Sequence, residues 1–370
     1  MVNDFDNCVE CKACEQICPK ACIRFVDGRL VLDEEKCISC NLCEKVCQVM
    51  TPVEFYKQNK VYAAIAKSNE IYNESSSGGI ANILYHTILN DGGVVFGVKY
   101  NDEFEPVFCC IEDETKLQNI LRSKYCFSNI GHIFKKCRDF CNNGRQVLFI
   151  GLPCQIAGLK SFLGKEFDNL ITVDILCHGA PHYNIFKNHI KYKQNKNNNN
   201  KIIDYQFRKK ENNQYGPYQY YISYANGRKE IGSALWDAYY KSFLKSEIFR
   251  KSCYSCQFAK KERVADITIG DFWTLRNTKV EFEGKEYISS IIVSTEKGNN
   301  FLKRCSKSLV LVESTFDDLK KSTHAVVAPE TNLSKLDIEK LFNYSYYAKW
   351  AKKYENSLIV KIRKLKNILK

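Results

Sequence analysis

The chain has 370 residues, of which 45% are hydrophobic and 13% aromatic, so it is long enough for about two to three domains with buried cores. Its net charge is +13, but it contains no helix-turn-helix, zinc-finger or RNA-binding motif, so we expect no nucleic-acid partner. No apolar run reaches the length of a transmembrane segment, and 19 cysteines without an export signal predict a cytoplasmic, metal-binding protein.

Two cysteine runs with the same spacing open the chain, and the second follows the first by 29 residues. In each run three cysteines stand at every third residue and a fourth follows four residues later, which is typical of 4Fe–4S ligation. In two-cluster domains the fourth cysteine of each run ligates the other cluster. The predicted ligands of the first cluster are Cys8, Cys11, Cys14 and Cys47, and those of the second cluster are Cys37, Cys40, Cys43 and Cys18.

Other uses of these cysteines fit less well. A structural zinc site normally has two cysteine pairs separated by a longer spacer, and a disulfide framework needs an oxidising compartment.

Between the runs, residues 23–26 and 29–32 flank Asp27-Gly28, which predicts a β-hairpin. Cys22 has no ligand position and is expected to be a buried thiol. Residues 1–50 hold nine acidic and six basic residues, so an acidic redox module (1–56) precedes a basic body suited to phosphate-bearing cofactors.

After a linker at 51–60 the pattern changes to alternating strands and helices, which predicts an α+β or α/β body. The expected strands are 61–67, 93–100, 104–111, 146–150, 170–176, 218–224, 264–269 and 288–294, and the expected helices are 80–89, 129–143, 156–163 and the segment from about 336. The Lys- and Asn-rich residues 191–201 are expected to form a solvated loop. The predicted boundaries are 60–145 and 146–330 for two lobes and 331–370 for a basic helical tail.

The loop Ser75-Ser76-Ser77-Gly78-Gly79 lies between a predicted strand and a predicted helix. Hydroxyls, exposed backbone N–H groups and a helix N-terminus together favour anion binding, and glycine lets the backbone approach a ligand closely. A flexible serine/glycine linker is the alternative. Ser123, Lys124 and Tyr125 could add a cation and a stacking ring to such a site.

Four further cysteines are candidates for a third cluster. Cys154 and Cys177 each follow a predicted buried strand, and ligands in α/β sheets gather at the carboxyl ends of strands. Cys253 and Cys256 supply a chelating pair from a later loop. Four thiolates are enough for another 4Fe–4S cluster. The alternative is that the first two thiols are small buried residues and that the late pair binds zinc or nothing.

The C-terminal tail combines basic residues with an apolar stripe. From 349 to 370 it has eight Lys or Arg and only one acidic residue, Glu355. Leu358, Ile362, Leu365 and Leu369 fall on one face of a helix. This pattern predicts either a helix whose stripe packs on the body or a peripheral contact with a membrane or an acidic partner.

Several motifs, taken together and in order, resemble one family. They are residues 75–79, 122–125, 151–159, 174–179, 253–256 and 263–273. Over nearly the whole chain they look like the coenzyme F₄₂₀ hydrogenase/dehydrogenase beta subunits, in which an N-terminal two-cluster ferredoxin domain is a frequent fusion partner. The resemblance implies an FAD-binding iron–sulfur flavoprotein and strengthens the prediction of a third cluster. The flavin contacts that it implies are Ser75, Ser76, Ser77, Gly78, Gly79, Ser123, Lys124, Tyr125, Gly151, Pro153 and Gln155.

The predicted function is therefore oxidoreduction between a soluble two-electron carrier at FAD and a chain of 4Fe–4S clusters. The carrier is a deazaflavin, a ferredoxin or another small molecule, since members of the family differ in this respect. The alternative is a non-catalytic electron-transfer subunit that docks on a hydrogenase-like or polysaccharide-biosynthesis partner. No catalytic side chain is identified from the sequence.

Overall fold

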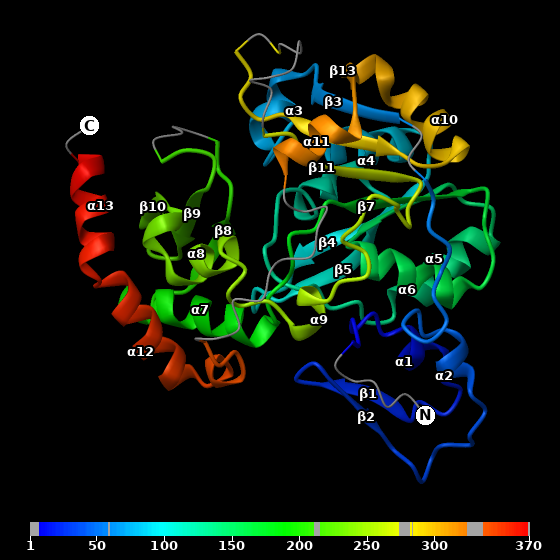
Figure 1. The fold of residues 1–370 in the computed structure, drawn as a ribbon, viewed down its shortest axis with the longest axis horizontal. Coiled ribbons are helices and arrows are strands. Elements are labelled where there is room, and N and C mark those ends of the chain that lie inside the picture. Colours follow the sequence, from blue (N-terminus) through cyan, green and yellow to red (C-terminus); the bar gives the residue numbers. More distant parts are fainter. Residues whose placement is uncertain are drawn as a thin grey trace.

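The computed structural model describes residues 7–57, 60–210, 215–273, 282, 284–323 and 336–368. These residues form a small N-terminal module, a large sheet covered by helices, and a second lobe with a small sheet (Figure 1). The mixture of helices with a large mixed sheet agrees with the predicted α+β or α/β body. The large sheet takes strands from both segments that were expected as separate lobes, 60–145 and 146–330.

The N-terminal module consists of two short helices and a hairpin. Its elements are α1 (Ala13–Ile17), β1 (Ile23–Val26), β2 (Arg29–Leu32) and α2 (Leu42–Lys45). The predicted hairpin is confirmed, with Val26 opposite Arg29 and positive φ angles at both turn residues, Asp27 and Gly28. The duplication is also visible in the backbone, because the N-caps of α1 and α2, Lys12 and Asn41, both have φ 57°.

The large sheet has eight strands in the order β13-β3-β12-β11-β7-β6-β4-β5. Their bounds are β3 (Lys60–Ala66), β4 (Val94–Tyr100), β5 (Pro106–Ile111), β6 (Val147–Gly151), β7 (Leu170–Ile175), β11 (Ile267–Asp271), β12 (Ser289–Val293) and β13 (Leu309–Ser314). The central strands β4, β6, β7 and β11 are parallel, whereas the outer pairs are antiparallel. The carboxyl ends of the parallel strands therefore meet at one edge, where α/β proteins usually bind ligands.

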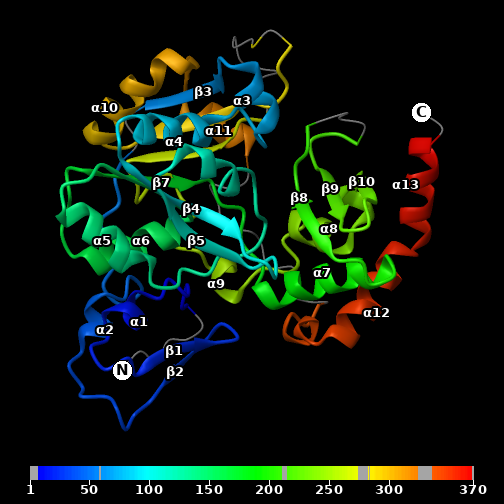
Figure 2. The same ribbon diagram turned by 180° about the vertical axis from the view of Figure 1, so that it is seen from behind.

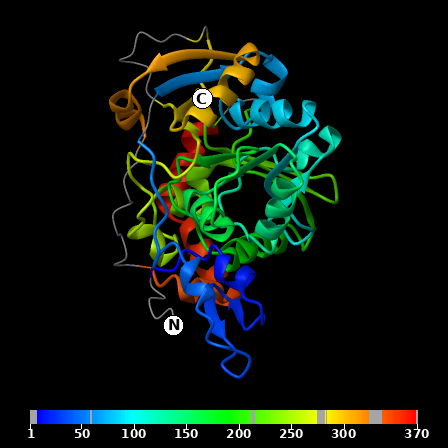
Figure 3. The ribbon, with the colours of Figure 1, turned by 90° about the vertical axis from the view of Figure 1, so that its right-hand side faces the viewer.

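Helices cover both faces of this sheet (Figure 3). They are α3 (Asn69–Glu74), α4 (Ile80–Asn90), α5 (Ile133–Asn142), α6 (Pro153–Leu163), α10 (Glu296–Cys305) and α11 (Phe316–Ser322). The 3₁₀ turns η1 (Glu114–Asn119) and η3 (Ser306–Ser308) join strands and helices. α4 and α10 share one apolar core, and α5 and α6 share another that also contains Val9, Ala13 and Val46 of the module. The module is thus packed into the core of the body.

The second lobe is built on a three-stranded antiparallel sheet of β8 (Ile202–Gln206), β9 (Gln219–Tyr224) and β10 (Lys229–Ser233). Its helical elements are α7 (Tyr183–Lys196), η2 (Ala234–Trp236), α8 (Ala238–Leu244), α9 (Lys251–Tyr254), η4 (Glu339–Phe342), α12 (Tyr344–Glu355) and α13 (Leu358–Ile368). The expected loop at 191–201 is wrong for its first half, because α7 continues to Lys196. Lys193 lies on the buried face of α7 and is fixed by Glu230 and Asp237, each 2.9 Å from its Nζ.

The tail folds as two helices along this lobe (Figure 2). Of the predicted apolar stripe, Leu358 and Ile362 are exposed, and Val360, which lies outside that stripe, is buried instead. Leu365 and Leu369 lie outside the residues whose side chains are described. Within the described part of the chain, no helix combines the length and hydrophobicity that crossing a bilayer requires.

The N-terminal module contacts both the body and the second lobe. Lys12 Nζ donates to Asn129 Oδ1 at 2.8 Å, and Phe134 N donates to Gln16 Oε1 at 3.0 Å on the body side. On the lobe side, Asn184 Nδ2 donates to Asp27 Oδ1 at 2.8 Å. These contacts fix where the cysteine runs lie relative to the sheet.

Candidate redox centres

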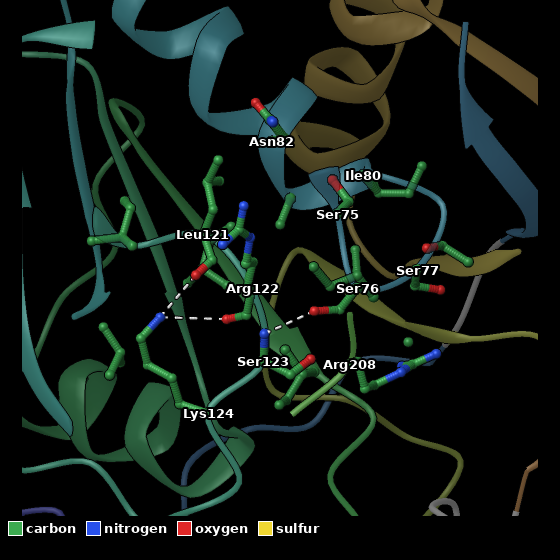
Figure 4. A pocket seen from close by; sticks show the side chains of 18 of the residues that line it. Ser75, Ser76, Ser77, Ile80, Asn82, Leu121, Arg122, Ser123, Lys124 and Arg208 are labelled. Atoms are coloured by element: carbon green, nitrogen blue, oxygen red, sulfur yellow. Dashed lines mark hydrogen bonds between the residues drawn. The ribbon is translucent and has the colours of Figure 1, made fainter. Parts of the chain in front are cut away.

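A cavity of about 310 Å³ opens at the carboxyl edge of the large sheet, and we call it the serine-loop cavity (Figure 4). Strand ends β6, β7 and β11 contribute Gly151, Ile175 and Asp271 to its wall. Most of the predicted flavin contacts line it, namely Ser75, Ser76, Ser77, Gly79, Ser123, Lys124, Tyr125, Gly151 and Gln155. Two do not. Gly78 does not line the cavity and its N–H donates to Ser289 Oγ at 2.9 Å, and Pro153 lines a neighbouring cavity.

The serine loop is held in place by its own hydroxyls and by the second lobe. Ser75 Oγ donates to Ile71 O at 2.7 Å, and Ser76 Oγ accepts from Ser123 N at 3.0 Å. Lys210 Nζ donates to Ser77 O at 2.6 Å. The loop leads into the N-terminus of α4, which points its first residues at the cavity. A helix N-terminus of this kind favours a phosphate group.

Arg208, which was not predicted from the sequence, adds a fixed cation to the same cavity. It follows β8 and reaches across from the second lobe, and its side chain is buried. Its Nη1 donates to both carboxylate oxygens of Asp271, at 2.9 and 2.7 Å, whereas Nε and Nη2 form no hydrogen bond with the described residues. Unpaired buried N–H groups are costly, so these two favour an anionic ligand. The only sequence signal was the basic run Arg208-Lys209-Lys210 after a strand.

Lys124 and Tyr125 have surroundings that limit their roles. Burial lowers the pKa of Lys124 to about 8, and its Nζ donates to Leu121 O at 2.9 Å. The ring of Tyr125 stacks on Phe243 with centroids 4.4 Å apart, so one of its faces is already covered. Gln155 is fully buried and accepts from Leu152 N at 3.0 Å, which shapes the turn from β6 into α6.

The four cysteines predicted for a third cluster line one small cavity of about 30 Å³, the four-cysteine cavity. Cys154 lies in the first turn of α6, Cys177 follows β7, and the pair Cys253 and Cys256 comes from α9 and the residues after it. Burial, together with the neighbouring Cys253 and Cys256, raises the pKa of Cys177 to about 12. Four facing thiols of this kind cannot all ionise unless a cation compensates them, which an iron core would do.

Among the described residues, no three His, Cys, Asp or Glu side chains converge as one metal ion would require. A single ion draws its ligands tightly around one point, whereas an iron–sulfur core is larger and holds its thiolates farther apart. The iron and sulfide content of the protein distinguishes a cluster from the zinc alternative.

The module brings together both predicted ligand sets. Cys18, Cys37, Cys40 and Cys43 line a cavity of about 420 Å³, which Cys14 and Cys22 also line. In the other set, burial raises the pKa of Cys8, Cys11 and Cys14, and the neighbouring thiolate of Cys47 raises it further. Cys22 is buried as expected, but it is not isolated, since its Sγ lies 3.3 Å from Cys18 Sγ.

The serine-loop cavity, the four-cysteine cavity and the module are in contact. Leu152 lines both cavities. One turn farther along α6, Gly158 lies against Cys11, and a Cβ at Gly158 would come within 2.9 Å of Cys11 Sγ. The loop from β6 into α6 thus touches the serine-loop cavity at Leu152, and α6 itself touches the four-cysteine cavity at Cys154 and the predicted first-cluster ligand Cys11 at Gly158.

Comparison with known proteins gives two matches to protein families. Residues 144–318 match the family described as the C terminus of the coenzyme F420 hydrogenase/dehydrogenase beta subunit, and residues 30–51 match the 4Fe-4S binding domain. The first range includes all four cysteines of the four-cysteine cavity, and the second includes the cysteines from Cys37 to Cys47. No curated protein matches the chain at a significant level.

Among solved structures, the chain is similar to a chain of the F420-reducing [NiFe] hydrogenase complex from Methanosarcina barkeri. The two are 14% identical, with a TM-score of 0.46, and the match covers 84% of this chain and 92% of the other. Similarity at this level does not establish a shared activity.

Proposed function

Because residues 144–318 belong to the family of C-terminal regions of coenzyme F420 hydrogenase/dehydrogenase beta subunits and residues 30–51 to the 4Fe-4S binding domain family, we propose that this chain is an iron–sulfur flavoprotein oxidoreductase. In this proposal the serine-loop cavity binds FAD. The four-cysteine cavity binds a third 4Fe–4S cluster, and the module binds two. When bound, FAD interconverts electron pairs and single electrons, which the clusters carry one at a time.

One observation carries the proposal most directly: a single helix, α6, and the loop before it touch all three sites in order. Leu152 lines the serine-loop cavity and the four-cysteine cavity, Cys154 lines the latter, and Gly158 contacts Cys11. A relay needs its centres close together, and successive turns of one helix are only about 5.4 Å apart. If the three sites were functionally unrelated, we would not expect them to lie along one helix.

The residues of the serine-loop cavity fit the phosphate groups of FAD. The N-terminus of α4 and the unpaired N–H groups of Arg208 supply positive potential, and Ser76 supplies a hydroxyl. The volume of about 310 Å³ is at the lower end for a small-molecule site. The apolar part of the wall, which includes Ile150, Leu152 and Ile269, would exclude water from the ring system.

A second cavity beside the first supports a soluble carrier as the exchange partner. It has a volume of about 470 Å³ and shares Leu121, Arg122, Ser123 and Lys124 with the serine-loop cavity. Lys99 and Lys201 add positive charge to its wall. A small anionic carrier would be attracted there, next to the proposed flavin.

The alternative, an electron-transfer subunit without a substrate of its own, is favoured by one feature. Leu358, Ile359 and Ile362 of α13 are exposed apolar side chains on the second lobe. Such a patch fits a partner protein or a peripheral membrane contact. Turnover of an artificial electron acceptor by the isolated chain, with a deazaflavin or ferredoxin as donor, would favour the enzyme. Turnover only after a redox partner is added would favour the electron-transfer role.

Cofactor content tests the proposal itself. The protein is purified without oxygen and assayed for iron, sulfide and flavin. About twelve irons per chain follow from twelve ligand cysteines, and one FAD is expected. A preparation that stays free of flavin after reconstitution with excess FAD would contradict the flavoprotein assignment.

A further inference from the structure

Arg250 lies between the module and the four-cysteine cavity, and the relay described above gives it no role. It is the N-cap of α9, its backbone N donates to Ala180 O at 3.2 Å, and its side chain is 6% exposed. The guanidinium lines the four-cysteine cavity. Phe127 covers it, with its ring centroid 3.4 Å from the guanidinium carbon. This cation is therefore well shielded from water.

Arg250 also reaches into the first cysteine run. Its Nη1 donates to Val9 O and to Glu10 Oε1, each at 3.0 Å. Val9 and Glu10 stand between two first-cluster ligands, Cys8 and Cys11. Glu10 has φ 55°, a left-handed conformation that is unfavourable for a residue with a side chain. The contact with Arg250 helps to hold this turn of the backbone.

The hydrogen-bonding capacity of Arg250 is only partly used by its neighbours. Glu10 balances its charge as the ion-pair partner among the described residues, but Nε forms no hydrogen bond with them. A buried guanidinium normally needs full pairing to offset the loss of hydration. The sulfur atoms of a cluster beside it would supply acceptors for the remaining N–H group.

We infer that Arg250 is a shared electrostatic element that raises the reduction potentials of the first and third clusters together and holds the module against the body. The inference rests on the proposed function, since it assumes that both clusters are present. Reduction adds negative charge to a cluster, and a nearby cation in a low-dielectric site stabilises the reduced state. Glu10 acts in the opposite direction, because its carboxylate disfavours that added charge.

Arg250 is therefore a positioning residue whose effect on the reduction potentials depends on its charge. A purely structural contact would show no such dependence on charge. Arg250→Lys keeps the charge and loses the planar fork. Arg250→Gln loses the charge, and Glu10→Gln removes the opposing charge while keeping a hydrogen-bond acceptor. A merely structural role predicts no consistent order of potentials among these three variants.

The test is a redox titration of the anaerobically purified full chain, followed by electron paramagnetic resonance. The Cys256→Ala variant identifies the third-cluster signal. In Arg250→Gln we expect the reduction potentials of the first and third clusters to become more negative. At a fixed potential, the ratio of reduced to oxidised cluster should fall about tenfold, which corresponds to about 59 mV for one electron. The second cluster should not shift, Arg250→Lys should stay near the wild type, and Glu10→Gln should shift the first cluster to more positive potentials.

A matched control removes one positive charge elsewhere in the contact region of the module. Arg29 lies in the hairpin with 74% of its side chain exposed and pairs with Glu339, so Arg29→Gln should leave all potentials unchanged. If Arg250→Gln loses iron, the test relies instead on the sign of the shift in the first-cluster reduction potential in Glu10→Gln. Unchanged first- and third-cluster potentials in Glu10→Gln, and in any Arg250→Gln protein that keeps its iron, would overturn the inference. Wild-type protein without these clusters would overturn the proposed function instead.

Discussion

The cysteines of the N-terminal module lie within residues 8–47, whereas those of the four-cysteine cavity are spread from 154 to 256. In the module, the ligands sit on helices of only five and four residues and on turns with left-handed residues at Glu10, Lys12, Ser39 and Asn41. The four-cysteine cavity takes its cysteines from the ends of strands and helices of the body and from α9 and the residues after it. Because its elements are so short, we expect the module to depend on a bound metal for its shape more than the body does.

Removal of iron should separate the two regions most clearly. If the full chain is treated with a chelator under reducing conditions, amide hydrogen exchange in residues 8–47 should accelerate by about a hundredfold or more, because metal binding supplies much of the folding free energy of such modules. Amides of β6, β7 and β11 should keep their protection. Equal loss of protection in both regions would show that the body also depends on its cluster.

Loss of one ligand from the body should remove one cluster and leave the module intact. Cys256→Ala should lower the iron content by about four per chain, and the signals of the two module clusters should remain. Cys305→Ala is the matched control, since this thiol is 1% exposed and packs beside Thr87, away from the cavities. Unchanged iron content in Cys256→Ala would reject the third cluster.

A larger residue in the serine loop tests whether the body alone forms the flavin-binding site. A Cβ at Gly78 would lie 2.5 Å from Ala64 O and 2.9 Å from Ser289 N, so Gly78→Ala must displace the loop. We expect flavin affinity to fall about tenfold or more, equivalent to about 1.4 kcal/mol, with the iron content unchanged. In Gly151→Ala the nearest atom would be 3.3 Å away, and a change of only a few-fold is expected.

Wild-type flavin affinity in Gly78→Ala would show that the loop does not hold the cofactor. Equilibrium titration of the apoprotein with FAD, followed by flavin fluorescence, measures both variants.

The last prediction concerns the junction of the two regions. Alanine normally favours a helix interior over glycine by about 1 kcal/mol. At Gly158 its Cβ would lie 2.5 Å from the Cβ of Cys11, so Gly158→Ala should instead destabilise the chain by about 1–3 kcal/mol. Denaturant unfolding measures this difference, and Ser161→Ala on the same helix is the control. A more stable Gly158→Ala variant would show that the module does not press on α6 in solution.

Sequence periodicity predicted the hairpin at 23–32 and most strands of the body, because these patterns depend on local residue order. It failed at 191–196, where a polar composition suggested a loop. There the buried ion pairs of Lys193 with Glu230 and Asp237 stabilise a helix, and those partners lie 37 and 44 residues away in the chain. Composition alone cannot reveal a partner at that separation.

The sequence by itself predicted the ligands of the module, since their spacing is local and repeated. It also named many of the residues that line the two cavities of the body, although Gly78 and Pro153 do not line the serine-loop cavity. Only the tertiary structure decided that Cys154, Cys177, Cys253 and Cys256 share one cavity. It also decided that Arg208 brings positive charge to the serine-loop cavity and Arg250 to the four-cysteine cavity. These arrangements depend on contacts between distant segments, which packing of the sheet and the second lobe creates.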